Sequence, residues 1–328
     1  MRLLVTGGAG FIGSHFVKRM LAADDDVVVL DKFTYAGNPA NLPSEVECVR
    51  GDIAVREDVE RIGPVDAIVN FAAETHVDRS ILGPHEFVRT DVLGTLVLLQ
   101  FAEQTSARFV QVSTDEVYGD VEEGWSSRED DPLRPSSPYS ASKAGGDLQV
   151  LAAVRTFGVN ASVTRGSNTY GPNQYPEKIL PLFVTNALDG SPLPLYGDGR
   201  QVRDWLHVED HCAAIELVLR DGAAGEVYNV GANDERENVE LTQVIVDHLG
   251  VEPALVRHVE DRAGHDRRYS LETTKIRGLG WKPRRAWNDG VRATIDWYRD
   301  NREWWEPIKR SGDFREYYDR QYAVRLQS

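Results

Sequence analysis

The chain has 328 residues and a formal net charge of −15, a length that allows one large or two ordinary domains with a substantial core. The acidic excess argues against nucleic acid as a partner, because phosphate contacts need clustered Lys and Arg side chains. No apolar stretch approaches the roughly 20 residues of a membrane span, so we expect no membrane association.

Short apolar runs alternate with stretches of helical spacing through the first half of the chain. Strands are expected at 3–6, 27–30, 46–49, 67–71, 109–112 and 160–165. Helices are expected at 14–21, at 88–102, and from about 137 to 156. This alternation predicts the α/β class, with a doubly wound parallel (Rossmann) sheet that helices cover on both faces.

After residue 165 the alternation ends, and loops rich in Gly and Pro indicate a second, smaller, mixed α/β substrate domain. We predict a dinucleotide-binding domain of residues 1–165 plus about 203–232, where the chain returns to the sheet. The smaller domain then comprises about 166–202 plus 233–310, with helices near 241–249 and 289–304. The tail, 311–328, has no clear period and either packs as an arm or stays loose.

A glycine-rich turn follows the first predicted strand and opens the first helix. Gly7, Gly10 and Gly13 allow a tight turn and close approach of the backbone to a pyrophosphate, with Phe11 and Ile12 at the helix N-terminus. Such a turn alone is weak support, since a strand-to-helix turn without a ligand has the same pattern.

Acidic residues end the next two strands. Asp31 lies where a carboxylate can bind the adenosine ribose, which favours NAD over NADP. Lys32 complicates that preference, because a basic neighbour can accommodate a 2′-phosphate. Asp52 and Ile53 are placed to meet the adenine, although Asp52 could equally cap a turn.

Two sets of reactive side chains follow the fifth strand. Tyr139 and Lys143 share one helix face, where the ammonium favours tyrosinate and prepares Tyr139 to take a hydroxyl proton. Thr114, Asp115 and Glu116 stand at the carboxyl end of a parallel strand, where such folds place their chemistry. Adjacent acids usually mark a solvated loop or a helix cap. At this position they suit additional proton transfers, as in an elimination of water.

Five segments closely resemble the dTDP-glucose 4,6-dehydratases, a family of extended short-chain dehydrogenases/reductases. They are Thr-Gly-Gly-Ala-Gly-Phe-Ile-Gly (6–13), Ala-Ala-Glu-Thr-His-Val-Asp-Arg-Ser (72–80), Ser-Thr-Asp-Glu-Val-Tyr-Gly (113–119), Ser-Pro-Tyr-Ser-Ala-Ser-Lys (137–143) and Asn-Gln-Tyr-Pro-Glu-Lys (173–178). The first and fourth define only the superfamily, whereas Thr-Asp-Glu and Pro-Glu-Lys are more specific. The resemblance ends near Pro307.

The resemblance implies a reaction on dTDP-glucose with NAD as cofactor. NAD oxidises carbon 4 with Tyr139 as base and Thr114 bound to the same oxygen. Glu116 removes the carbon 5 proton, Asp115 protonates the leaving hydroxyl of carbon 6, and the hydride returns to carbon 6. The product is a 4-keto-6-deoxy sugar nucleotide. Asp115 must then be protonated while Glu116 is ionised, which proximity and burial can bring about.

The resemblance also assigns binding positions. Further cofactor contacts are expected at Thr34, Phe71, Ala72, Ala73, Thr75, Thr90 and Thr169, besides Tyr139 and Lys143. Substrate contacts are expected at His76, Thr114, Asn168, Lys178, Ile179, Pro194, Leu195, Tyr196, Arg203, Asn238 and His265. Within this set, residues 194–196 match the nucleotide-base loop, and Lys178 and Arg203 neutralise the diphosphate. No metal is expected, because no second His or Cys lies at ligand spacing from His265.

The sequence departs from the usual family pattern at three positions. Thr75 stands where Ser is usual, Gly166 where Cys is common, and Thr169 where a second Asn is frequent. The last change weakens the expectation that the residue 169 side chain holds the cofactor.

Several questions stay open from the sequence. A nucleotide-sugar 4-epimerase shares the turn, the Tyr/Lys pair and two lobes, but would not need the Asp-Glu pair. A cofactor-sensing regulator could dispense with the catalytic groups. The family implies a homodimer through helices at about 92–106 and 138–156, although packing on their own sheet explains their apolar content equally well. We expect a cytoplasmic protein, because the chain begins on a strand without a signal-peptide pattern, and we expect free, buried thiols at Cys48 and Cys212.

Overall fold

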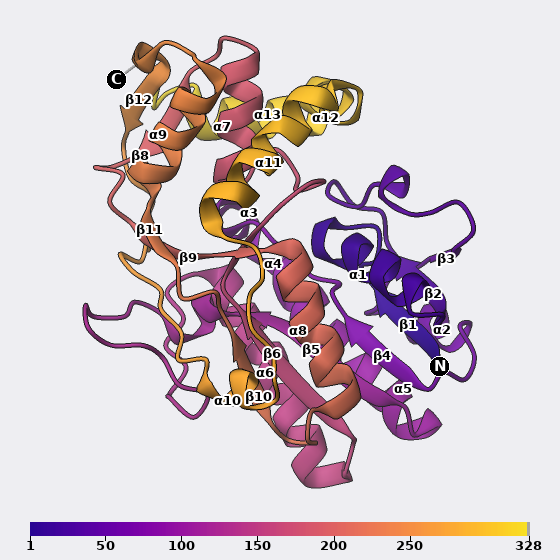
Figure 1. The fold of residues 1–328 in the computed structure, drawn as a ribbon. Helices are drawn as coiled ribbons and strands as arrows, with labels where there is room; N and C mark the ends of the chain where they lie inside the picture. Colours follow the sequence, from indigo (N-terminus) through magenta and orange to yellow (C-terminus); the bar gives the residue numbers. More distant parts are fainter. Residues whose placement is uncertain (327–328) are drawn as a thin grey trace.

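A computed structural model describes residues 1–326, which form a large sheet-centred lobe and a smaller lobe above it (Figure 1). The large lobe contains a seven-stranded sheet in the order β10-β6-β5-β4-β1-β2-β3, and every neighbouring pair is parallel. The strands are β1 (Arg2–Thr6), β2 (Asp26–Asp31), β3 (Glu47–Arg50), β4 (Ala67–Asn70), β5 (Arg108–Thr114), β6 (Ala161–Gly166) and β10 (Val227–Val230). The predicted doubly wound α/β fold is confirmed.

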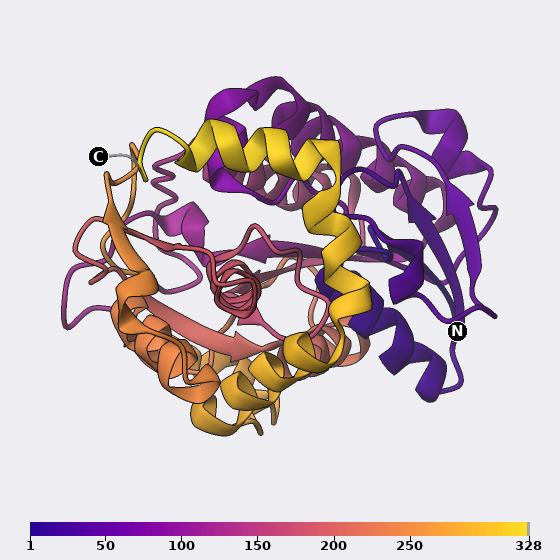
Figure 2. The ribbon, with the colours of Figure 1, turned by 90° about the horizontal axis from the view of Figure 1, so that it is seen from above.

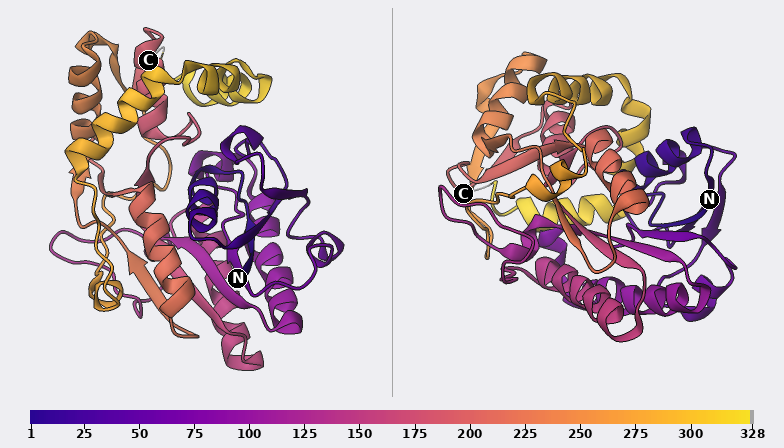
Figure 3. Two further views of the ribbon diagram at one scale, coloured as in Figure 1. Left: turned by 45° about the vertical axis from the view of Figure 1, so that its right-hand side comes forward. Right: turned by 60° about the horizontal axis from the view of Figure 1, so that its bottom comes forward.

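Helices cover both faces of this sheet (Figure 3). One face carries α1 (Phe11–Ala22), α8 (Val208–Asp221) and α10 (Thr274–Gly278), and the other α2 (Arg56–Glu60), α5 (Thr95–Thr105) and α6 (Pro138–Phe157). Because successive strand residues point to opposite faces, Leu3 and Val5 share a core with α1, whereas Leu4 belongs to the core beneath α5. This two-sided burial explains the continuous apolar runs of the strands.

The predicted helix at 88–102 consists of two pieces, a π-helical segment, η2 (Val88–Gly94), and α5, which runs on to Thr105. Two short helices, α3 (Val77–Leu82) and α4 (Pro84–Phe87), precede them. Such π-turns are frequent at functional sites. This one places the buried side chain of Asp91 beside α6, where Ser142 donates a hydrogen bond to it.

Helix α6 has strong local start and stop signals. Ser137 and Ser140 form a capping box, Pro138 occupies the first turn, and Gly158 ends the helix with φ +71°. The helix is further tied to the sheet by a buried ion pair of 2.8 Å between Arg165 of β6 and Asp147. These constraints fix the helix face that carries the predicted Tyr/Lys pair.

The smaller lobe has two small sheets and its own apolar core. One sheet holds β7 (Asn168–Tyr170), β9 (Val202–His207) and β11 (Glu235–Glu237), and the other β8 (Leu193–Tyr196) and β12 (Val256–Val259). Its helices are α7 (Ile179–Leu188), α9 (Asn238–Leu249), α11 (Trp287–Asp300), α12 (Arg302–Arg310) and α13 (Gly312–Tyr322). Short 3₁₀ turns are η1 (Pro39–Asn41), η3 (Asp115–Tyr118) and η4 (Pro253–Leu255). Through residue 326, the structure contains no helix with both the length and the apolar character needed to cross a membrane.

The second half of the chain differs from the prediction in detail. Within the segment expected to return to the large sheet, α8 and β10 do so, whereas β9 pairs with β7 and β11. The single helix expected at 289–304 is two helices that break at Asn301. The tail packs, because α13 buries Phe314 and Tyr322 in the core of the smaller lobe, and only residues 327–328 lie outside the description.

The two cysteines are free, as predicted, but only Cys212 is buried. The expectation of a buried thiol is wrong for Cys48. This residue lies on β3, an edge strand of the sheet, which has a neighbouring strand on one side only among residues 1–326.

Candidate active site

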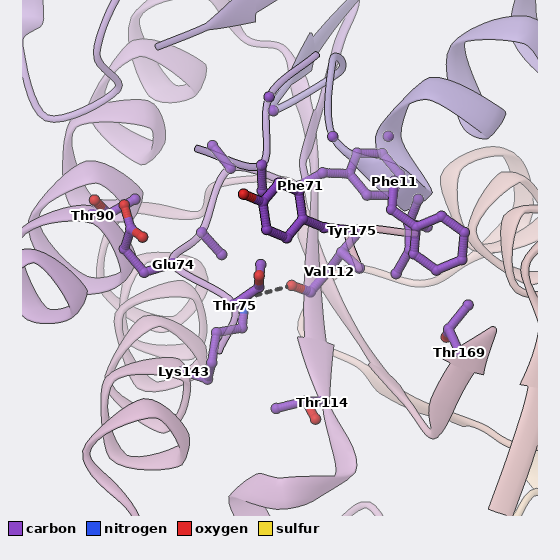
Figure 4. A pocket seen from close by; sticks show the side chains of 18 of the residues that line it. Phe11, Phe71, Glu74, Thr75, Thr90, Val112, Thr114, Lys143, Thr169 and Tyr175 are labelled. Atoms are coloured by element: carbon purple, nitrogen blue, oxygen red, sulfur yellow. Dashed lines mark hydrogen bonds between the residues drawn. The ribbon is translucent and has the colours of Figure 1, made fainter. Parts of the chain in front are cut away.

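A cavity opens at the carboxyl ends of the parallel strands, above β1 and β4. From β1 the chain continues to β2 and β3 on one side, whereas β4, β5 and β6 lie on the other, so this is the switch point where such folds bind ligands. Every residue expected to contact the cofactor lines this cavity. Figure 4 shows the part around Phe71, Thr90, Thr114 and Lys143.

The glycine-rich turn has the shape of a phosphate cradle. A Cβ atom on Gly7, whose φ is +65°, would lie 2.6 Å from the Ala72 nitrogen, and one on Gly13 would lie 2.4 Å from the Gly7 oxygen. Helix α1 begins directly after Gly10, and no side chain caps it. Its first N–H groups are therefore left to bind an anion at the positive end of the helix.

Asp31 organises the next loop. Its two carboxylate oxygens accept hydrogen bonds from the Ala9 N–H at 2.9 Å and the Phe33 N–H at 2.7 Å. Burial nevertheless raises the pKa of Asp31. Each carboxylate oxygen keeps a further lone pair, so this group can still accept from ribose hydroxyls.

The basic residue next to Asp31 is already engaged. The Lys32 ammonium lies 3.1 Å from the carboxylate of Asp52, which also forms an ion pair with Arg89. Asp52 also accepts from the Ala54 N–H at 2.9 Å, so it caps its turn as the simpler interpretation proposed, while still lining the cavity. The positive charge of Lys32 is therefore largely compensated, which limits its ability to attract a 2′-phosphate.

Tyr139 and Lys143 point into the cavity from α6. The Lys143 ammonium donates to the Val112 carbonyl at 2.8 Å, the bond dashed in Figure 4. Burial raises the pKa of Tyr139 well above its ordinary value, nearby Glu116 and Asp91 raise it further, and a hydrogen bond with Thr114 opposes the rise. The protein surroundings other than Lys143 thus favour the neutral phenol, so forming tyrosinate depends on the ammonium and on a cationic ligand.

The two adjacent carboxyl groups differ in their surroundings. Asp115 is 3% exposed, and one of its oxygens has no hydrogen-bond partner among residues 1–326. Burial raises the pKa of Asp115 well above its ordinary value, and the charge of Glu116 raises it further. Burial also raises the pKa of Glu116, but there Arg262, Lys178 and Arg203 act against the rise. The arrangement therefore favours a protonated Asp115 beside an ionised Glu116.

A second cavity extends from the first toward the smaller lobe, and both are lined by Glu116, Asn168, Glu177 and Lys178. Apart from Thr114, which lines the first cavity, every residue expected to contact the substrate lines the second. Glu116 thus lies where the two cavities meet, and Asp115 and Tyr139 line the first one.

The cations of the second cavity are positioned by backbone oxygens and aromatic rings. The Lys178 ammonium donates to the Thr75 carbonyl, close to where the cavities meet. Arg203 donates to the Asp266 carbonyl at 2.9 Å and stacks 4.2 Å from the centre of the Tyr269 ring. Burial lowers the pKa of both side chains, and a bound anion would oppose that effect.

Two other predicted side chains have local partners. His265 forms a 2.6 Å contact with Asp261, and burial with two nearby arginines lowers the pKa of the imidazole to about 4. The Thr169 hydroxyl bonds the Ser167 carbonyl and His211, so its side chain is occupied, as the departure from the family pattern suggested. No cluster in residues 1–326 has the His, Cys, Asp or Glu ligands for a metal ion.

The unusual Gly166 has a steric explanation. A Cβ atom at this position would lie 2.4 Å from the Cε1 atom of His211, whose ring occupies that space. A cysteine here would require the buried His211 to move. The small size of residue 166 and the position of the His211 ring therefore depend on each other.

Sequence reasoning missed several lining residues. Arg262 lines the second cavity and counteracts the rise in the Glu116 pKa, but its charged surface-like segment offered no signal. Glu177 lies in the specific Pro-Glu-Lys segment, which was a signal, and it binds Arg79 at 2.8 Å. Asp91 lines neither cavity, but its charge raises the pKa of Tyr139. The sequence gave no signal for it, because a lone acid in an amphipathic helix usually faces solvent.

These features define an extended short-chain dehydrogenase/reductase: a parallel sheet with a glycine cradle at its switch point, a Tyr/Lys pair and a second lobe. A family profile described as GDP-mannose 4,6 dehydratase matches residues 4–294. The chain belongs to this nucleotide-sugar 4,6-dehydratase family.

The similar proteins include named dehydratases. The dTDP-glucose 4,6-dehydratase of Streptomyces niveus is 53% identical, with the match covering 94% of this chain and 96% of that protein. The solved DesIV dTDP-glucose 4,6-dehydratase of Streptomyces venezuelae, with NAD and TYD bound, superimposes with a TM-score of 0.92 at 54% identity, covering 94% of this chain and all of that one. A Thermus thermophilus UDP-glucose 4-epimerase in complex with NAD reaches a TM-score of 0.87 at 34% identity, covering 92% of this chain and all of that one.

The buried Asp115 should lower the stability of the fold increasingly as pH rises. Its raised pKa means that the folded chain holds this proton more tightly than the unfolded chain, so stability is lost as pH rises above the unfolded value of about 4. Asp115→Asn should therefore stabilise the protein more at about pH 8 than at about pH 5. Urea unfolding at both pH values measures this, and an equal change at both would contradict the interpretation.

Proposed function

We propose that this protein dehydrates dTDP-glucose to dTDP-4-keto-6-deoxyglucose, with NAD as a cofactor that is regenerated in each cycle. Membership of the dehydratase family supports the reaction. The choice of dTDP-glucose and NAD is supported by the relatives described above, which are named dTDP-glucose 4,6-dehydratases and include a structure with NAD bound. The observation that carries the proposal is the pair Asp115 and Glu116, which are adjacent but differ in their charge surroundings.

The first cavity fits NAD. The cradle that a Cβ would fill and the uncapped start of α1 suit a diphosphate, and Asp31 suits a ribose. Thr90 Oγ1 and Asn168 Oδ1 are buried without partners among the described residues, as expected of groups that meet a ligand. When bound, NAD accepts a hydride from carbon 4 of the sugar and returns one to carbon 6.

The side chains then handle the protons. Tyr139 takes the proton of the carbon 4 hydroxyl while Thr114 binds the same oxygen, and Lys143 supplies the positive charge that favours tyrosinate. Once carbon 4 is a ketone, the carbon 5 proton becomes acidic, and Glu116 removes it. Asp115, protonated because it is buried, gives its proton to the departing carbon 6 hydroxyl, so water leaves. The proton held by Glu116 then returns to carbon 5 as the hydride reaches carbon 6. Over the whole cycle, the proton taken by Tyr139 replaces the one that Asp115 gave up.

An activity assay tests the proposal against its alternatives. Purified protein incubated with dTDP-glucose should yield a 4-keto sugar, seen as an absorbance that appears on adding alkali. A 4-epimerase would instead yield the galactosyl nucleotide, and a cofactor-binding regulator would yield neither product. Turnover of several glucose nucleotides in parallel measures the preference for thymidine.

Glu116→Gln should remove the base and leave the earlier oxidation intact. We expect kcat to fall by about a hundredfold to ten-thousandfold, because a general base contributes that much. Solvent deuterium should no longer enter carbon 5, as followed by NMR or mass spectrometry. Glu123→Gln, at an exposed residue, serves as the matched control. Undiminished exchange in Glu116→Gln would exclude Glu116 as the base.

Gly13→Ala should weaken NAD binding without harming the second cavity. The added Cβ would overlap the Gly7 oxygen at 2.4 Å and deform the phosphate cradle. We expect the Kd for NAD to rise at least about tenfold by calorimetry, an effect of roughly 1.4 kcal/mol. Gly278→Ala adds a methyl group with nothing within 4 Å and is the control. Unchanged affinity in Gly13→Ala would contradict the assigned role of the turn.

We further propose a cytoplasmic homodimer that pairs through η2–α5 and α6. Leu93, Leu96 and Leu148 on these helices are 44%, 36% and 57% exposed, so packing on their own sheet does not account for them. Light scattering should give twice the mass of one chain, and in Leu148→Glu the measured mass should fall toward that of a single chain. A monomeric wild-type protein would refute the dimer.

A further inference from the structure

Asp91 is a buried carboxyl group that the reaction described so far does not use. It belongs to the π-helical segment η2 and is 1% exposed. The segment packs closely against α6, since a Cβ atom on Gly146 would lie 2.8 Å from the Asp91 carbonyl oxygen. An ionised carboxylate held this far from water costs free energy unless it is paired. The position of Asp91 beneath the helix that carries Tyr139 and Lys143 therefore needs an explanation.

The hydrogen bonds of Ser142 differ between the two protonation states of Asp91. The Ser142 hydroxyl lies 2.5 Å from a carboxyl oxygen of Asp91 and 2.8 Å from the backbone oxygen of Tyr139. A hydroxyl group has one hydrogen, so donation to an ionised Asp91 takes it away from the Tyr139 oxygen. When Asp91 carries a proton, it donates to Ser142, and Ser142 donates to the Tyr139 oxygen. Only the protonated form uses both short contacts.

The charges around Asp91 act in both directions. Burial raises the pKa of Asp91 to about 7, and the charge of Glu74 adds to the rise. Lys143, Ser142 and the backbone N–H of Glu74 oppose it. Glu74 lies in the loop after β4, and its side chain and that of Lys143 are labelled in Figure 4. The titratable groups that act on Asp91 thus come from α6 and from this loop.

The charge of Asp91 affects the Tyr/Lys pair directly. Lys143 is 4% exposed and supplies the positive charge that favours tyrosinate at residue 139. An ionised Asp91 offsets that charge and raises the pKa of Tyr139. A protonated Asp91 is neutral, so it leaves the field of Lys143 at the phenol undiminished.

We propose that Asp91 is a positioning residue for the oxidation at carbon 4: it holds a proton against Ser142 and so keeps the charge of Lys143 acting on Tyr139. The inference rests on the proposed function, in which Tyr139 is the base. Two titrations then oppose each other. A rise in pH favours tyrosinate directly, but it also removes the proton of Asp91, and the new negative charge disfavours tyrosinate.

The test compares Asp91→Asn with the wild-type residue. Asparagine has nearly the size of aspartate, and its oxygen can accept from Ser142, but it is uncharged at every pH. Glu103→Gln removes the same charge at an exposed position of α5 and is the matched control. Each change is made in a chain that also carries Glu116→Gln, so that elimination does not follow oxidation. Stopped-flow mixing of the NAD-loaded protein with dTDP-glucose then measures the absorbance of reduced nicotinamide.

The two proteins should differ only where Asp91 is ionised. Below about pH 6, Asp91 holds its proton, so Asp91→Asn and its parent should reduce NAD at the same rate. Above about pH 7, Asp91→Asn should be faster, by severalfold to about tenfold, because one buried charge shifts a neighbouring pKa by about one unit. Glu103→Gln should match its parent throughout, because solvent screens an exposed charge.

A second measurement needs no ligand and checks that Asp91 holds a proton. Its raised pKa means that the folded chain binds this proton more tightly than the unfolded chain, so stability falls as pH rises from about 4 to about 7. Urea unfolding should therefore show that Asp91→Asn gains stability relative to the wild type between about pH 5 and about pH 8. An equal difference at both pH values would overturn the inference, even if the variant were inactive.

The remaining outcomes separate the inference from the proposed function. A uniform loss of rate at every pH would indicate a purely structural role for Asp91 and overturn the inference. Identical pH profiles for Asp91→Asn and its parent, with normal wild-type turnover, would overturn it while leaving the proposed function intact. A wild-type protein that makes no 4-keto product from dTDP-glucose would refute both together.

Discussion

The chemistry of this protein depends on an uneven distribution of positive charge around two adjacent carboxyl groups. Asp115 and Glu116 are both buried where the chain turns after β5, and this burial raises the pKa of each carboxyl group. Three cations counteract the rise in the Glu116 pKa. At Asp115, only Arg203 and a hydrogen bond with Thr114 act against burial and the charges of Glu116 and Asp204. An acid and a base can therefore coexist one residue apart near neutral pH.

That distribution is produced by segments distant in the sequence. Lys178 comes from the start of α7, Arg203 from β9 and Arg262 from the loop after β12. The smaller lobe thus closes the second cavity and also sets the protonation of groups carried by the large lobe. Asp78 of α3 extends the connection, because it accepts a hydrogen bond from Gln321 of α13 and forms an ion pair with Arg262, which acts on Glu116.

Much of the fold follows from local patterns. The alternation of apolar runs and helical spacing predicted six of the seven strands of the large sheet to within a few residues, because strands buried on both faces are continuously apolar. Two helices differ from the prediction for local reasons. The π-turn at Val88–Gly94 keeps the spacing of apolar residues close to that of a helix, so the pattern does not reveal it. The break at Asn301 lies inside a continuous amphipathic pattern, which predicted one helix where there are two. The edge position of β3, which exposes Cys48, depends on strand order and has no local signal.

The sequence by itself determined the class of fold, the glycine cradle, the Tyr/Lys pair and the Asp-Glu pair, since each depends on residue types at short, fixed spacing. Only the tertiary structure decided which carboxyl group faces the cations, that His211 fills the space beside Gly166, and that α13 reaches the second cavity. The physical reason is that burial and Coulomb interactions depend on distances in space, and the groups concerned lie tens to hundreds of residues apart along the chain.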